Sequence, residues 1–166
     1  MDNARVQLRR LDEDLLTALL DAAVADADPT EVMPPVPGPP GWTADRRAAF
    51  LAFHHEWAAT PTTYAILVAG HVVGAARLQP APEAPDDALE TGLWIGRSHR
   101  GRGVGHAVLA LLRTEAKSQG ATRIVATTTE ANTAARRLLT TAGADLRPRT
   151  TPTPNGDTIE ATLPLD

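Results

Sequence analysis

The sequence predicts a mixed α/β fold, and two observations support this fold class. First, segments with helical spacing of apolar residues alternate along the chain with short β-rich runs. Second, residues 64–68 and 72–78 flank an Ala-Gly-His turn, which is the pattern of a β-hairpin. Hairpins mixed with helices fit a sheet that contains antiparallel strands better than a doubly wound parallel sheet.

The first half of the chain is predicted to contain one short strand and two helices besides the hairpin. Residues 6–8 form the strand, and leucines at helical spacing predict a helix over residues 12–27. A proline run at residues 34–41 can form neither a helix nor a central strand, and its simplest interpretation is a stiff connector. The second helix begins after Thr43 as N-cap and extends to residue 57, with aromatic residues on one face that are expected in the core.

The second half is predicted to contain three strands and two helices. The strands are at residues 89–95, 124–128 and 158–163, and the helices are at 103–119 and 131–142. A glycine follows each helix, as is common where a helix ends in a left-handed conformation. Two proline-rich segments, 80–87 and 147–155, are expected to be loops, the second of them mobile.

Length and composition indicate a single domain over residues 1–166. Cysteine is absent from the sequence, which excludes a disulfide framework, a thiolate metal site and a cysteine nucleophile. The net charge of −4 does not provide the basic surface that general nucleic-acid binding requires. The sequence has no apolar run long enough to span a membrane and no signal-peptide pattern, so a cytoplasmic location is expected.

The five histidines do not have metal-ligand spacing, so no metal is predicted. His54 and His55 are adjacent on the second helix and point to different faces, so at most one of them can face a pocket. That histidine is a candidate base, and a histidine without a catalytic role is the alternative.

The most informative segment joins the strand at residues 89–95 to the helix that follows it. Residues 100–105 contain two arginines and three alternating glycines. Glycine lets the backbone turn tightly and approach a ligand, and the first helical turn leaves N–H groups unpaired with a partial positive charge. Together these features predict an anion site suited to a phosphate or pyrophosphate, with a solvent-exposed loop as the alternative.

Two common phosphate motifs do not fit this loop. A Walker loop requires a lysine after the last glycine, whereas His106 follows Gly105. A dinucleotide fingerprint requires Gly-x-Gly-x-x-Gly, whereas the spacing from Gly101 is Gly-x-Gly-x-Gly. The pattern that does fit is Arg/Gln-x-x-Gly-x-Gly/Ala, with Arg100 as its first residue.

This pattern is the acyl-CoA pyrophosphate motif of the GNAT superfamily of N-acetyltransferases, which the sequence resembles over residues 62–145. Residues 90–95, Glu-x-Gly-x-Trp-Ile, resemble the fourth strand of the branch that acetylates ribosomal-protein alanine and small amines. Residues 132–143, which begin with Asn and end with Gly, resemble a later helix of the family. The motifs occur in the family's order, one helix and one strand apart.

The resemblance implies a central mixed, largely antiparallel sheet of six or seven strands flanked by about four helices. It also implies acetyl-CoA as the acyl donor and direct aminolysis by a primary amine of a small molecule or a protein N-terminus, in a monomer or homodimer. Residues implied to bind the cofactor are Leu93, Trp94 and Ile95 for the pantetheine arm, Arg100, Gly101, Arg102, Gly103, Val104 and Gly105 for the pyrophosphate, and Asn132 and Arg136. Arg100 and Arg102 are expected to supply countercharge, and a solvated helix face is the alternative for Arg136.

The catalytic residues rest on fewer observations. Glu90 stands where this branch often has an acidic residue facing the acceptor pocket, so it is the candidate general base, with Asp86 and Asp87 as substitutes. A surface carboxylate at a strand end is the other interpretation of Glu90. The tyrosine that many members use to protonate the departing thiolate is replaced by Leu139, so the general acid is missing or supplied elsewhere, for instance by Thr133.

Two other functions stay open at this point. A non-catalytic acyl-CoA sensor of the same fold would bind the cofactor without releasing thiol, and the missing tyrosine motivates it. A nucleotide-phosphate binder of another fold would prefer ATP or NAD to acetyl-CoA. For the acceptor, the family's layout adds an interpretation of the proline run as a pre-ordered wall of the site, and the acidic residues from Glu83 to Glu90 are expected to attract a cationic amine.

Overall fold

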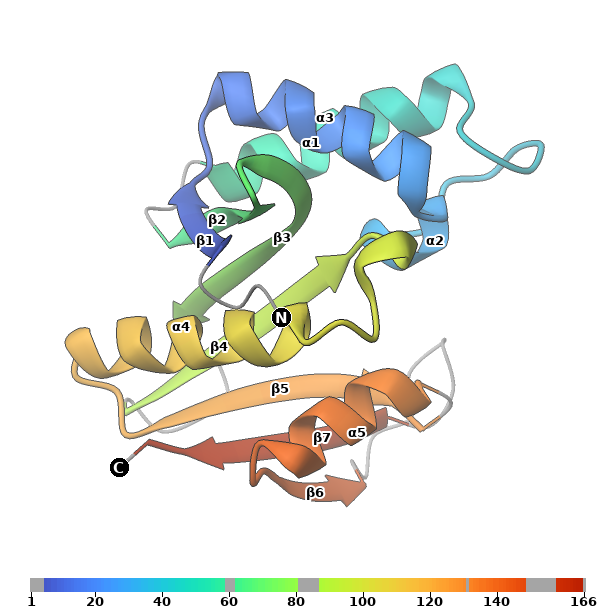
Figure 1. The fold of residues 1–166 in the computed structure, drawn as a ribbon. Helices are drawn as coiled ribbons and strands as arrows, with labels where there is room; N and C mark the ends of the chain where they lie inside the picture. The colour runs from blue at the N-terminus through green and yellow to red at the C-terminus, as the bar shows by residue number, and fades with distance from the viewer. Residues whose placement is uncertain (1–4, 59–61, 81–86, 131, 149–157, 166) are drawn as a thin grey trace. The chain divides into compact units, whose positions relative to one another are not determined.

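The computed structural model describes residues 5–58, 62–80, 87–130, 132–148 and 158–165. The strands in this part are β1 (Val6–Arg10), β2 (Thr63–Val68), β3 (His71–Pro80), β4 (Ala88–Ile95), β5 (Arg123–Thr129), β6 (Asp145–Pro148) and β7 (Thr158–Pro164) (Figure 1). The helices are α1 (Glu13–Asp26), α2 (Pro29–Val32), α3 (Ala44–Ala58), α4 (Val104–Ser118) and α5 (Thr133–Thr141), with a 3-10 turn, η2 (Arg97–His99), before α4.

The strands form one seven-stranded sheet in the order β1-β2-β3-β4-β5-β7-β6. β4 and β5 are parallel. The pairs β1–β2, β2–β3, β5–β7 and β6–β7 are antiparallel. The predicted mixed, largely antiparallel sheet of six or seven strands is therefore confirmed.

The described chain divides into two compact units. The first consists of Met1–Arg77 and Leu93–Val108, and the second of Leu78–Gly92 and Leu109–Asp166. Each unit has buried apolar residues of its own. The single domain expected over residues 1–166 stays a prediction.

In the first unit, α1 and α3 pack against each other (Figure 1). Leu19 of α1 and Phe50 of α3 are fully buried, and they belong to one apolar cluster with Leu67 of β2. Asp12 caps α1, because its carboxylate accepts a hydrogen bond from the N–H of Leu15 at 2.8 Å. The two helices predicted in this half are confirmed, although the side chain of residue 57 lies outside the described part.

α2 is a single helical turn that the apolar periodicity did not predict. The carboxylate of Asp28 accepts from the N–H of Thr30 at 3.0 Å, and that of Glu31 accepts from the N–H of Asp28 at 3.2 Å. This capping box, with Pro29 in the first turn, stabilises a four-residue helix. Four residues are too few to show helical spacing, so the turn has no periodic signal in the sequence.

The proline run after α2 is neither helix nor strand, as predicted, and Arg46 of α3 holds it in place. The guanidinium donates to the Val36 carbonyl from Nε at 3.2 Å and from Nη2 at 2.9 Å. It also donates to the carbonyls of Gly38 at 3.2 Å, Gly41 at 2.8 Å and Pro39. Because one rigid cation serves several carbonyls, the segment is fixed against the start of α3.

In the second unit, β5 pairs with β7, β7 pairs with β6, and the first half of β4 runs parallel to β5. Ile124 and Leu163 are cross-strand partners on β5 and β7, and both are buried. Leu112 of α4 and Leu139 of α5 are buried as well. The predicted strands and helices of this half are confirmed.

β6 corrects one prediction, because residues 147 and 148 of the expected loop belong to a strand. Arg147 and Pro148 pair with Glu160 and Ile159 of β7 in an antiparallel ladder. A four-residue edge strand that contains a proline has no alternating apolar pattern, so the sequence resembles a loop at this point. Residues 149–155 of the predicted loop lie outside the described part of the chain.

We expect Arg46→Gln to lower the free energy of unfolding by about 1–2 kcal/mol, because several charge-assisted hydrogen bonds are lost while the exposed carbonyls regain water. Urea denaturation of the variant measures the change. Arg47→Gln is the matched control, since Arg47 makes a single longer contact of 3.4 Å to the Trp42 carbonyl. Equal stabilities of the two variants would contradict this role of Arg46.

Candidate functional site

The anion loop, defined here as residues 100–105, contains two glycines in the left-handed region immediately before α4. Gly101 and Gly103 have φ angles of +72° and +84°, which side chains with a Cβ rarely adopt. The first backbone bond of α4 runs from the N–H of Ala107 to the carbonyl of Gly103 at 3.1 Å. The three preceding N–H groups therefore have no acceptor within the helix. Glycines with positive φ that alternate with ordinary residues before a helix start favour a bound phosphate.

Arg100 is held by contacts within the protein, and its expected role at the pyrophosphate stays a prediction. Its Nε donates to the Ile95 carbonyl at 2.8 Å, and its Nη2 donates to Glu31 of α2 at 2.5 Å. Its backbone N–H donates to the Arg97 carbonyl at 3.2 Å. Arg100 thus fixes the start of the loop with its guanidinium and its amide.

Arg102 is the arginine of the anion loop that remains for a ligand. Its side chain is exposed and makes no hydrogen bond or ion pair with any residue in the described ranges. Of the two arginines expected to supply countercharge, Arg102 is the one whose guanidinium has no partner in the described ranges.

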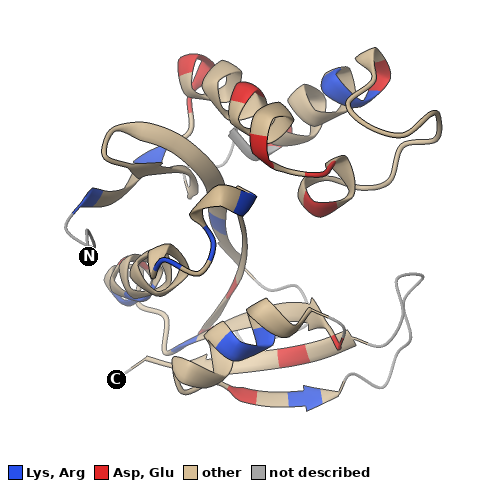
Figure 2. Ribbon diagram, turned by 45° about the vertical axis from the view of Figure 1, so that its right-hand side comes forward, with Lys and Arg blue, Asp and Glu red and all other residues tan. Residues whose placement is uncertain are grey.

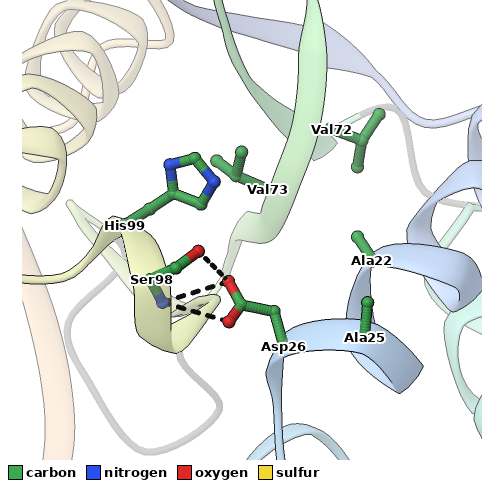
Figure 3. Close-up of a pocket in the computed structure, with 7 residues that line it drawn as sticks. All are labelled: Ala22, Ala25, Asp26, Val72, Val73, Ser98 and His99. Atoms are coloured by element: carbon green, nitrogen blue, oxygen red, sulfur yellow. Dashed lines mark hydrogen bonds between the residues drawn. The ribbon is translucent and has the colours of Figure 1, made fainter.

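A second contact holds η2 to the end of α1. The Asp26 carboxylate accepts from the N–H of Ser98 at 3.1 Å and from its hydroxyl at 2.6 Å (Figure 3). The hydrogen bond from the Ser98 hydroxyl is the main reason why the pKa of Asp26 lies below its usual value. A Cβ on Gly96 would fall on this carboxylate, so glycine at that position permits the close approach.

A pocket of about 320 Å³ adjoins this contact. Alanines of α1 and valines of β3 line it together with Asp26, Ser98 and His99 (Figure 3). None of the residues predicted to bind the cofactor is part of this lining, although the structure describes all of them. The pocket is therefore not the predicted donor site.

The end of β4 is fixed by the core of the first unit. Trp94 is buried, and its ring lies edge-on to Phe50 with centroids 6.2 Å apart. Its indole N–H donates to Nε2 of His54 at 3.4 Å. The side chain of Trp94 therefore supports the core, and the cofactor role implied for its backbone stays a prediction.

His54 is a core histidine. Its ring stacks on Phe50 at 3.9 Å, and Nδ1 lies 3.0 Å from the Phe50 carbonyl, so Nδ1 carries the proton. Burial lowers the pKa of His54 from 6.5 to about 4, which keeps the ring neutral. His55 is exposed and lies 3.7 Å from Glu13.

The predicted site residues of the second unit have their own local roles. Asn132 caps α5, since its side-chain oxygen accepts from the N–H of Ala135 at 3.1 Å. Arg136 donates from Nη1 to the Glu130 carbonyl at 3.0 Å. Leu139, at the position of the missing tyrosine, is 7% exposed and belongs to the core.

The candidate bases also lie in the second unit. Glu90 is half-buried on β4, in register with Val125 of β5. Asp87 is bound by the Thr122 hydroxyl and by Arg123, and these hydrogen bonds lower its pKa. Asp86 and Glu83 lie outside the described residues.

Glu160 is a carboxylate that the sequence analysis did not select. It is half-buried on β7 and is the cross-strand partner of Thr127. Val125 and Thr127 are two residues apart on β5, so their side chains lie on the same face of the sheet. Glu90 is the register partner of Val125 and Glu160 is the partner of Thr127, so both carboxylates lie on that face. The signal in the sequence was a lone acidic residue between apolar residues at 159 and 161, but only the register relates it to Glu90.

The model of the acetyltransferase (GNAT) family matches residues 17–144 of the chain. The protein belongs to this family. Members of the GNAT acetyltransferase family use acetyl-CoA. Among curated proteins, none matches the sequence.

Solved structures confirm the fold at low sequence identity. RimJ of Mycobacterium smegmatis, in complex with CoA-disulfide, has a TM-score of 0.72 at 21% identity and covers 96% of this chain and 81% of its own. YncA of Salmonella typhimurium, with its cofactor acetyl-CoA, has a TM-score of 0.65 at 21% identity, covering 98% and 95%. AAC(6′)-Ib in complex with ribostamycin and coenzyme A has a TM-score of 0.71 at 19% identity, covering 96% and 93%.

The described residues also bear on membrane insertion and on metal binding. None of the helices in this part combines the length and the apolar character needed to cross a membrane. Within the same residues, no group of three or more histidine or acidic side chains is arranged to hold a metal ion.

The buried His54 makes stability depend on pH. The unfolded chain takes up a proton near pH 6.5, whereas the folded chain takes it up only near pH 4, so acid favours unfolding between these values. We expect the free energy of unfolding to fall by about 3 kcal/mol across this window on account of His54. Urea denaturation at several pH values measures it, and His54→Gln should flatten the curve. The same pH dependence in both proteins would contradict the assignment.

Proposed function

We propose that the protein transfers an acetyl group from acetyl-CoA to a primary amine of a small molecule or a protein N-terminus. The observation that carries the proposal is the anion loop, in which Gly101 and Gly103 have positive φ angles immediately before α4. This geometry suits the pyrophosphate of CoA, and the family match supplies the donor. A bound acetyl-CoA or CoA in similar structures supports the same interpretation.

Donor binding is assigned to backbone groups before side chains. The N–H groups of Val104 and Gly105 hold the pyrophosphate, and the guanidinium of Arg102 supplies countercharge. Backbone groups from Leu93 to Ile95 bind the pantetheine arm, as the resemblance implies. Asn132 and Arg136 belong to the second unit, and their assignment to the cofactor rests on the family motif alone.

The proposed reaction is direct aminolysis of the thioester. The neutral amine attacks the thioester carbonyl, an N–C bond forms, and the C–S bond breaks with release of the CoA thiolate. Glu90 takes the proton of the attacking amine, directly or through water, and a backbone N–H of β4 stabilises the oxyanion. Because Leu139 replaces the usual tyrosine, the thiolate leaves without a proton from that position.

The acceptor is assigned only by class. A ribostamycin complex of AAC(6′)-Ib shows that a protein of this fold binds an aminoglycoside, which supports a small amine here. The expected cytoplasmic location and the expected monomer or homodimer are part of the same proposal.

The buried leucine at position 139 favours one second candidate, a non-catalytic acyl-CoA sensor of the same fold. The test is release of free thiol from acetyl-CoA with a panel of polyamines, aminoglycosides, amino acids and short peptides, with mass spectrometry of each product. Thiol release with an acetylated amine supports the enzyme. Tight binding of acetyl-CoA without turnover supports the sensor, and absence of both overturns the donor site.

We expect Gly103→Val to raise the dissociation constant of CoA roughly 100-fold, equivalent to about 2.7 kcal/mol, because the side chain disfavours the loop geometry and blocks the approach of phosphate. Isothermal titration calorimetry measures the change. Gly120→Val is the matched control, because Gly120 has the same φ of +84° and follows α4. Equal CoA affinities of the two variants would remove the loop from the donor site.

We expect Glu90→Gln to reduce turnover roughly 100-fold or more while the affinity for CoA is kept, because an amide cannot take a proton from the amine. Steady-state kinetics from pH 6 to pH 9 and calorimetry with CoA measure the two effects. Glu160→Gln is the comparison, since Glu160 shares the face of Glu90. A loss of turnover in Glu160→Gln alone would transfer the role of base to Glu160.

A further inference from the structure

Arg97, which precedes the anion loop, and Arg100, the first residue of the loop, converge on one carboxylate, that of Glu31 in α2. Arg97 donates to Glu31 Oε1 from Nε at 3.2 Å and from Nη2 at 2.7 Å. Arg100 donates to Glu31 Oε2 from Nη2 at 2.5 Å. Both oxygens of the carboxylate are therefore engaged by guanidinium groups, a strong form of hydrogen bond. Figure 2 shows acidic positions on α1 and α2 and basic positions in the segment before α4.

Glu31 is itself held in position by the short helix that carries it. Its Oε1 also accepts from the N–H of Asp28 at 3.2 Å, which completes the capping box of α2. The neighbouring Pro29, Val32 and Met33 are buried, so α2 is packed into the first unit. The side chain of Glu31 is 28% exposed, compared with 60% for Arg97 and 40% for Arg100. Although partial burial acts to raise its pKa, hydrogen bonds from the two arginines lower the pKa of Glu31 overall.

These contacts decide which groups of the loop remain for a ligand. Arg100 is bound at Nε by the Ile95 carbonyl, at Nη2 by Glu31, and at its amide by the Arg97 carbonyl. Ser98, between Arg97 and Arg100, is bound by Asp26. The chain is thus fixed at Arg97, Ser98 and Arg100, and the groups without such contacts begin at residue 101.

We propose that Glu31 is a positioning residue for the acyl donor. It fixes Arg97 and Arg100 so that the N–H groups of residues 101–106 are arranged for the pyrophosphate before CoA binds, and it keeps both guanidinium groups from contacting the ligand. This inference rests on the proposed function. A site that is pre-arranged loses less conformational freedom when it binds, which is the physical source of the gain in affinity.

The opposite role for Glu31 makes the opposite prediction. If the carboxylate merely occupied two arginines that belong to the ligand, pyrophosphate would have to displace it, and removing its charge would strengthen CoA binding. If Glu31 positions the loop, removing its charge weakens CoA binding. The sign of the change in affinity therefore separates the two roles.

The test is calorimetry with CoA and steady-state kinetics with acetyl-CoA on the full-length Glu31→Gln variant. We expect the dissociation constant of CoA and the KM for acetyl-CoA to rise about tenfold, and kcat at saturating acetyl-CoA to change less than twofold, because the fixed contacts are remote from the thioester. Asp21→Asn is the matched control, since it removes one exposed negative charge from α1. The CoA affinity of the control should stay within twofold of the wild type.

A second set of variants separates positioning from direct contact and from loss of folding. Arg97→Gln should also raise the dissociation constant of CoA, and the double variant Glu31→Gln/Arg97→Gln should be no weaker than Glu31→Gln, because both side chains belong to one network. The dependence of CoA affinity on salt should keep its slope in Arg97→Gln and become shallower in Arg102→Gln, because only Arg102 contacts phosphate. Arg97 is largely exposed, so this variant remains informative if Glu31→Gln does not fold.

Unchanged or tighter CoA binding in Glu31→Gln, or a shallower salt slope in Arg97→Gln, overturns the inference while leaving the proposed function intact. A wild-type protein that does not bind CoA overturns the proposed function itself. A decrease of kcat with unchanged CoA affinity also overturns the inference, because it assigns Glu31 to a different step.

Discussion

The anion loop depends on ionic and polar contacts that hold the chain immediately before it. A site built from backbone N–H groups has few side chains of its own to maintain its geometry. Its shape therefore depends on the position and direction of the chain at the start of the loop. Glu31 binds Arg97 and Arg100, and Asp26 binds Ser98, so three of the four residues before Gly101 are fixed by side chains of α1 and α2. The position of the loop is therefore determined by α1 and α2, two elements that lie about 70 residues earlier in the sequence.

The core of the first unit fixes the other end of the same segment. Trp94 packs edge-on to Phe50, and its N–H is accepted by a neutral His54, so the last residues of β4 cannot move without breaking a buried polar contact. Gly74 permits β3 to lie close to the end of β4, because a Cβ at Gly74 would collide with the carbonyl of Trp94. Residues from Trp94 to Arg100 are thus held on one side by apolar packing and on the other by charged groups.

The electrostatics of the loop follow from this arrangement. Asp28 and Glu31 lie close to a segment that is proposed to bind an anion, but Arg97 pairs with both carboxylates and Arg100 pairs with Glu31. In the proposed function, the attraction for phosphate comes from the helix start of α4 and from Arg102. A proposed local anion site is thereby compatible with a net charge of −4.

Several parts of the fold and the site followed from local pattern, and others did not. The strand at β4 and the glycines of the loop were predictable, because each depends on a few neighbouring residues. α2 and β6 were not, because each has four residues and no periodicity. Arg100 was predicted to meet the ligand, but whether a guanidinium is free depends on Glu31, whose position the sequence does not indicate.

The sequence by itself determined the fold class and the location of the anion loop, because glycine at positive φ and apolar periodicity are local constraints that the chain carries everywhere. Only the tertiary structure decided which charges are available at that loop. A side chain's charge becomes available or is neutralised according to its partner in space, and the partners of Arg97, Arg100 and Ser98 come from α1 and α2. The pairing of β5 with β7 likewise decided that Glu160 shares a face with Glu90, because register relates residues that are far apart along the chain.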